Sequence, residues 1–197
     1  MTALSLTLLV ALTAPGTPAR NARPRSDTPA ATAPAPDLSD AEVESRVRTY
    51  LGAIDTPISA DRWRALGPRA VAPLEAVLRD PEALPSRRAK AVEALSVVGG
   101  ARARQLVLET AHSEQEPFGV RASALRGAPR VLPAKELVKQ LRPVMEGAQD
   151  PTVRAAAAEV LARHAAKSSC AAVRAQASRE GEARGQFANA VERCGGR

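Results

Sequence analysis

The stretch "DPTVRAAAAEVLARHAA" at residues 150–166 decides the fold, because the chain repeats its pattern. Related segments are "RRAKAVEALSVVG" at 87–99 and "VRASALRGAPRVL" at 120–132. The alignment sets three arginines 33 residues apart, each followed by Ala, any residue and Ala: Arg88, Arg121 and Arg154. A weaker fourth copy is "ARGQFANAVERC" at 183–194. Self-similarity with a period in the thirties predicts a solenoid of stacked helix pairs.

Amphipathic segments precede two of these copies. Residues 67–81 and 134–151 each carry apolar residues at helical spacing and end in Asp-Pro, which terminates a helix and starts a turn. The apolar positions are Val71, Leu74, Val77 and Leu78 in the first segment, and Leu137, Leu141, Val144 and Met145 in the second. The alanines of the following helix are small enough for neighbouring helices to approach closely. We therefore expect about four antiparallel helix pairs.

The composition supports an all-α fold class. The chain is 45% hydrophobic but only 2% aromatic, so its core must consist mainly of Ala, Leu and Val. A chain so poor in aromatic residues disfavours a β-sandwich or β-barrel, which need aromatic and β-branched strands.

The order Pro, Asp-Pro, then Val-Arg-x-x-Ala-x-x-x-Leu resembles the HEAT repeat, including its short phycobilisome-lyase-like variety. The resemblance covers roughly residues 67–197. It implies an α-solenoid in which turn carboxylates and helix arginines form a ladder of ion pairs between repeats. The residues matching that ladder are Asp80, Arg88, Glu116, Arg121, Asp150 and Arg154. The lyase activity does not carry over, because no residue pattern for it is present.

The unit at 101–133 departs from the family pattern. It lacks the proline of the first helix, and Glu116 stands where the turn aspartate is expected. Gly127 and Pro129 fall within its second helix, which we expect them to interrupt.

Residues 38–66 fit a helix pair that caps the stack. Ser39 followed by Glu42 forms the pattern of a capping box, which would begin the first helix. Trp63 is expected to cover the exposed end of the stack, with ligand stacking as the alternative role.

The N-terminal part predicts export. Residues 1–19 contain a short apolar run followed by small residues, which is typical of a signal peptide cleaved near Ala19. Residues 20–37 read as a disordered Pro/Ala-rich linker, and residues 38–197 as the HEAT-like repeat domain. The expected location is periplasmic or secreted, with no transmembrane span in the mature chain. A buried N-terminal helix and a misplaced start are the alternatives.

Two cysteines, Cys170 and Cys194, lie in the last unit. They stand at similar distances before and after a turn expected near Gly181, so an antiparallel hairpin would bring them together. Export and an even cysteine count favour a disulfide between them. Two buried thiols are the alternative. A zinc site using His164 as well would lack a fourth ligand.

The chain offers no catalytic constellation. It has no Gly-rich phosphate loop, no G-x-S-x-G motif and no Cys-x-x-Cys pair, so we expect no enzyme, no cofactor and no metal. The predicted function is an exported, non-enzymatic scaffold whose repeat surface binds another protein. The contact candidates lie on the polar side of the repeated helices: Arg87, Lys90, Arg126, Glu159 and Arg163.

The net charge of +7 leaves two further partners open. One alternative is a cytoplasmic HEAT-like protein that binds nucleic acid on a basic concave face. The other is an anionic component of the cell envelope. The positive charge is spread along the repeats and aromatic stacking residues are scarce, which disfavours nucleic acid.

Overall fold

The computed structural model describes residues 38–54 and 56–195, and all regular secondary structure in these residues is helical. The all-α prediction is therefore confirmed. The α-helices are α1 (Asp40–Gly52), α2 (Ala60–Leu66), α3 (Val71–Arg79), α4 (Pro85–Val98), α5 (Gly100–His112), α6 (Phe118–Val131), α7 (Ala134–Gly147), α8 (Pro151–His164), α9 (Ala166–Arg179) and α10 (Ala188–Arg193). Two 3₁₀ helices, η1 (Gly67–Ala70) and η2 (Gly181–Phe187), join them. The predicted signal peptide and linker lie outside the described residues.

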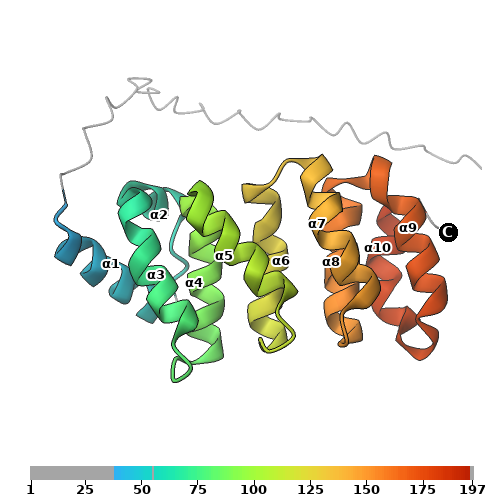
Figure 1. Cartoon of the computed structure of the whole chain (residues 1–197), viewed down its shortest axis with the longest axis horizontal. Coiled ribbons are helices and arrows are strands. Elements are labelled where there is room, and N and C mark those ends of the chain that lie inside the picture. Colours follow the sequence, from blue (N-terminus) through green and yellow to red (C-terminus); the bar gives the residue numbers. More distant parts are fainter. Residues whose placement is uncertain (1–37, 55, 196–197) are drawn as a thin grey trace, which may run out of the picture. The chain divides into compact units, whose positions relative to one another are not determined.

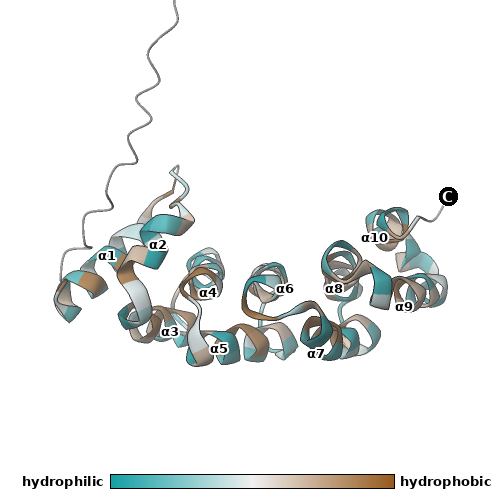
Figure 2. Cartoon of the chain, turned by 90° about the horizontal axis from the view of Figure 1, so that it is seen from above, coloured by the Kyte–Doolittle hydropathy of each residue, from teal (hydrophilic) through white to brown (hydrophobic). Residues whose placement is uncertain are grey.

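The helices of residues 38–195 follow one another in a row (Figure 1). Seen from above, α3, α5 and α7 lie along one side of this row, and α4, α6 and α8 lie along the other (Figure 2). These two sides form two layers, α3/α5/α7 and α4/α6/α8. Between the layers, α3 packs against α4, α5 against α6 and α7 against α8; within the second layer, α4 packs on α6 and α6 on α8. The helices predicted at 67–81 and 134–151 correspond to η1–α3 and α7, respectively.

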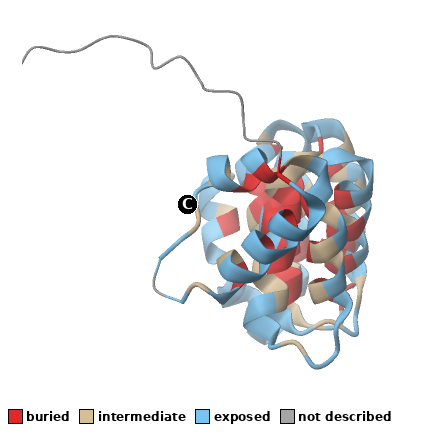
Figure 3. Cartoon of the chain, turned by 90° about the vertical axis from the view of Figure 1, so that its left-hand side faces the viewer, coloured by how far each residue is buried: buried red, intermediate tan, exposed pale blue. Residues whose placement is uncertain are grey.

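The core consists mainly of Ala, Leu and Val, as the composition predicts, and also contains Trp63, Met145 and Phe187. The buried residues, red in Figure 3, lie between the helices. The repeated alanines Ala91, Ala124 and Ala157 are fully buried in the α4/α6/α8 layer. A methyl side chain at these positions lets adjacent helices approach closely while still filling the space between them. Larger side chains, among them Leu95 and Leu161, are also fully buried and complete the packing.

Helix α6 is continuous, so the predicted interruption at Gly127 and Pro129 is wrong. Pro129 lies in the last turn of α6, where it removes one intrahelical hydrogen bond without ending the helix. Gly127 is buried against α4, and a Cβ atom there would lie 2.7 Å from Ser96 Cβ. This glycine therefore permits the close approach of α4 and α6.

Gly127→Ala is expected to destabilise the protein by about 1–3 kcal/mol, because overpacking at the α4–α6 contact outweighs the better helix propensity of alanine. The matched control is Gly119→Ala in the same helix, where the added Cβ meets nothing within 4 Å. The control should leave stability unchanged or raise it. Urea denaturation of both variants measures the difference, and equal effects would show that α4 and α6 separate easily.

The N-terminal pair forms as predicted. Ser39 caps α1, and Glu42 accepts from the Ser39 backbone N–H at 2.8 Å, which completes the capping box. Trp63 is buried, and its ring meets Tyr50 edge-on at a centroid distance of 5.2 Å. Both rings belong to the first pair of helices, α1 and α2.

The last unit differs from the earlier ones. Its second helix is replaced by η2 and the short α10, and a left-handed backbone conformation at Gly181 begins the change. Arg184, which aligns with the repeated arginines, is exposed in η2. The predicted disulfide is confirmed, because Cys170 of α9 is bonded to Cys194, whose Cα lies 5.3 Å away.

Candidate binding surface

The three repeated arginines occupy equivalent positions between the two layers. Each donates to a carbonyl at the C-terminal end of the preceding helix: Arg88 Nε to Leu78 O at 2.8 Å, Arg121 Nε to Ala111 O at 3.4 Å, and Arg154 Nη1 to Ala148 O at 2.6 Å. Carbonyls at a helix C-terminus lack intrahelical partners and attract positive charge. The repeated arginine therefore joins the two helices of each pair.

A glutamate completes each of these arginine contacts. Ion pairs join Arg88 to Glu116 at 2.6 Å, Arg121 to Glu114 at 2.8 Å and Arg154 to Glu180 at 2.5 Å. Glu116 and Glu180 come from the following helix pair, whereas Glu114 belongs to the same pair as Arg121. Hydrogen bonds from Arg121 and Arg154 are the main cause that lowers the pKa of Glu114 and of Glu180, so both carboxylates stay charged.

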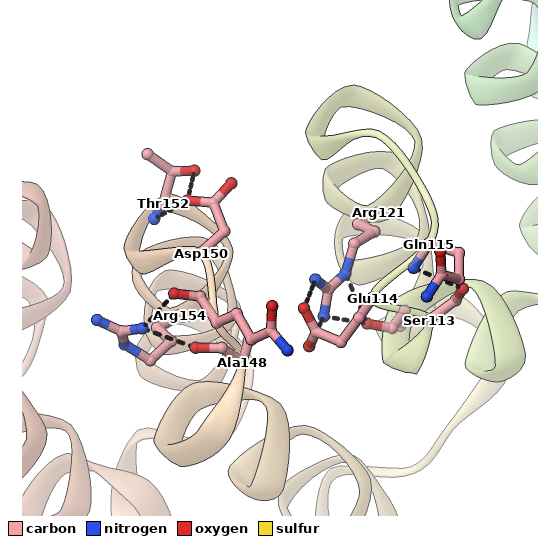
Figure 4. A network of polar contacts seen from close by, with 10 residues as sticks. Ser113, Glu114, Gln115, Arg121, Ala148, Asp150, Thr152 and Arg154 are labelled. Atoms are coloured by element: carbon pink, nitrogen blue, oxygen red, sulfur yellow. Dashed lines mark hydrogen bonds and ion pairs between the residues drawn. The ribbon is translucent and has the colours of Figure 1, made fainter.

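The two aspartates assigned to the ladder have a different role. Asp80 accepts the backbone N–H of Glu82 at 2.9 Å, and Asp150 accepts that of Thr152 at 2.8 Å as the N-cap of α8 (Figure 4). An aspartate side chain is short enough to bond the backbone two residues further on. In the described residues, neither aspartate forms an ion pair with a repeated arginine.

The five contact candidates separate into three places. Arg126, Glu159 and Arg163 line one groove between α6 and α8, together with Arg130 and His164. Lys90 lines a different cavity, and Arg87 is exposed in the first turn of α4, outside both.

The cavity that contains Lys90 lies beside the α1–α2 connection and has a volume of about 410 Å³. Tyr50, Ile58 and Trp63 give it an apolar wall, and Lys90 closes one side by donating to Ala53 O. Arg130 lines this cavity as well as the groove, so the two are adjacent on the α4/α6/α8 layer. An apolar cavity with a few polar groups at its edge is typical of ligand and peptide sites.

Sequence reasoning missed Arg130, the residue shared by the cavity and the groove. Its position four residues after Arg126 on one helix was a usable signal, because such residues share a helix face. The cavity itself gave no signal, since it depends on where the connection between α1 and α2 packs.

The described residues contain no cluster of three or more His, Cys, Asp or Glu side chains placed to hold a metal ion. The zinc alternative for the last unit is wrong, because Cys170 and Cys194 are joined in the disulfide. His164 is exposed at the C-terminal end of α8.

No helix within residues 38–54 and 56–195 has the length and apolar character needed to cross a membrane.

Comparison with protein-family models, with curated proteins and with solved structures found no match.

Proposed function

We propose that this chain is a non-enzymatic α-solenoid of HEAT-like repeats that binds another protein through the exposed face of the α4/α6/α8 layer. The observation that carries the proposal is the adjacency of the apolar cavity and the charged groove, which share Arg130. An apolar pocket bordered by polar side chains is the usual composition of a protein-binding hot spot. Helices α2 and α10 lie at the two ends of the row, on the same side as α4, α6 and α8, so both ends of this face project beyond its middle (Figure 2).

The hydrogen bonds and ion pairs of the three equally spaced arginines support the repeat architecture. Arg88, Arg121 and Arg154 each bind a helix C-terminus and a glutamate, although the sequences around them differ. In this architecture α3–α4, α5–α6, α7–α8 and α9–α10 are the four repeats, and α1–α2 is the N-terminal cap. Stacked repeats of this kind present extended surfaces for partner binding.

We place the protein outside the cytoplasm, in the periplasm or secreted. The bond between Cys170 and Cys194 supports this location, because stable disulfides belong mainly to oxidising compartments. Intact-mass measurement of the native protein, with thiol labelling before reduction, tests it. Free thiols on a full-length chain would contradict export.

Site-specific photo-crosslinking in the native cells tests the binding face. A crosslinking side chain at position 90 or 126 should give adducts of higher mass that survive nuclease treatment and contain peptides of a second protein. Positions 104 and 135 are the matched controls, because Arg104 and Lys135 are exposed on α5 and α7 of the opposite layer. They should give few adducts. Adducts from positions 90 and 126 that only a nuclease removes would overturn the proposal in favour of nucleic-acid binding.

A further inference from the structure

Two arginines of the groove between α6 and α8 carry charge that the described residues do not neutralise. Arg126 Nη2 donates to Ser123 Oγ at 2.9 Å, and Arg130 Nη1 donates to Ser96 Oγ at 3.2 Å. No ion pair within the described part of the chain involves either arginine. The hydroxyl groups orient the two guanidinium groups while leaving their positive charge available, which favours binding of an anion.

The opposite wall of the groove adds one partly neutralised cation. Arg163 pairs with Glu159 at 2.7 Å, and its side chain is still 51% exposed. The groove therefore holds three arginines and one carboxylate. Desolvation is the main cause that lowers the pKa of His164, and the charges of Arg163 and Arg130 lower it further.

We propose that this groove binds an acidic segment of the partner protein, with carboxylates that pair with Arg126 and Arg130; the inference rests on the function proposed above. The two arginines lie one turn apart, a rise of about 6 Å along α6. In an extended peptide, every second side chain points the same way at intervals of about 6.6 Å. Acidic residues at alternate positions of an extended segment therefore match the spacing of the two arginines along α6.

A polypeptide fits this surface better than a nucleic acid does. Glu159 in the groove and Glu93 in the adjacent cavity would repel a continuous phosphate backbone. Trp63 is only 7% exposed, so its ring offers little surface for base stacking. A peptide can instead place neutral residues opposite the two glutamates.

The test measures binding of a fluorescent peptide of alternating Glu and Ala by anisotropy at about 0.1 M salt, where the Debye length is about 10 Å. The peptide should bind the wild-type protein, and the Arg126→Gln/Arg130→Gln variant should bind at least about tenfold more weakly, because it loses two charge-assisted contacts. The control variant Arg104→Gln/Lys135→Gln has the same net charge but is changed on the opposite layer. It should retain affinity within about twofold, because distant exposed charges are screened.

A second measurement follows the His164 ring by NMR. Carboxylates bound beside Arg130 and Arg163 should raise the His164 pKa, whereas binding elsewhere would leave it unchanged. Equal affinity for a Gln-Ala peptide, or equal loss in both double variants, would overturn the inference. Tighter binding of oligothymidylate or of phosphatidylglycerol vesicles with the same arginine dependence would also overturn it. If the acidic peptide fails while protein crosslinks form at positions 90 and 126, the acidic preference is wrong and the proposed function stands.

Discussion

Arg154→Ala is expected to lower the free energy of unfolding by about 3–5 kcal/mol, the loss typical of a buried ion pair deprived of one partner. The Glu180 side chain is only 2% exposed and would lose its ion pair, keeping only the hydrogen bond that Gln176 Nε2 donates at 2.6 Å. The C-terminal end of α7 would also lose its donor, because Arg154 bonds both Ala148 O and Gln149 O.

Arg48→Ala is the matched control for this prediction. Arg48 also forms an ion pair with a glutamate at 2.7 Å, but both side chains are exposed on α1. Its removal should cost no more than about 0.5 kcal/mol. Denaturation in urea compares the two variants. Similar small losses would show that water reaches Glu180 and that the Arg154 pair does not hold α8 against the last unit.

The same pair predicts a dependence on pH. Arg154 is the main cause of the lowered pKa of Glu180, so the pair contributes stability above the ordinary glutamate value of 4.5. This contribution is lost as the pH falls through the lowered pKa. The stability difference between the wild type and Arg154→Ala should therefore shrink below pH 4.5. A difference that stays constant down to acid unfolding would show that Glu180 does not carry the effect.

Removal of the disulfide is expected to cost about 3–4 kcal/mol, because the bond closes a loop of 24 residues in the unfolded chain. The last unit also depends on it locally, since η2 and the short α10 replace a full second helix there. Unfolding with and without reductant measures the effect on the wild type.

The double variant Cys170→Ala/Cys194→Ala supplies the control, because its stability should not respond to reductant. Hydrogen exchange should become faster in α9 and α10 of this variant, while α4 and α6 keep their protection. A uniform increase in hydrogen exchange along the chain would show that the disulfide acts only through the unfolded state. If removing the disulfide lowers the free energy of unfolding by less than about 1 kcal/mol, the entropic argument is wrong.

The repeated pattern predicted the helices well, because helix formation depends on residues that are close together in the chain. Leu137, Leu141, Val144 and Met145 recur at helical spacing, and all four are buried in α7. The alanine at the same place in each copy is buried in α4, α6 and α8. Periodicity of this kind identifies which face of a helix must leave water, whatever that face packs against.

The partners in the ion-pair ladder were predicted less well, because the pairing depends on how far each side chain extends across a turn. Arg88, Arg121 and Arg154 were identified from their spacing, but Glu114 and Glu180 were not identified as partners. Which carboxylate meets a guanidinium depends on turn length and on side-chain length, and a short aspartate can bond its own backbone first. Helix α6 shows a similar limit, since Gly127 reads as a helix breaker in the sequence yet serves the contact with Ser96.

The sequence by itself determined the all-α class, the amphipathic helices, the capping box at Ser39 and the cysteine pair, because each depends on residues close in the chain or on a simple hairpin. Only the tertiary structure decided the groove between α6 and α8 and the cavity beside the α1–α2 connection. The physical reason is distance along the chain: Tyr50, Lys90 and Arg130 come from three separate helices. Side chains so far apart become neighbours only when the helices pack, and no local pattern in the sequence records that packing.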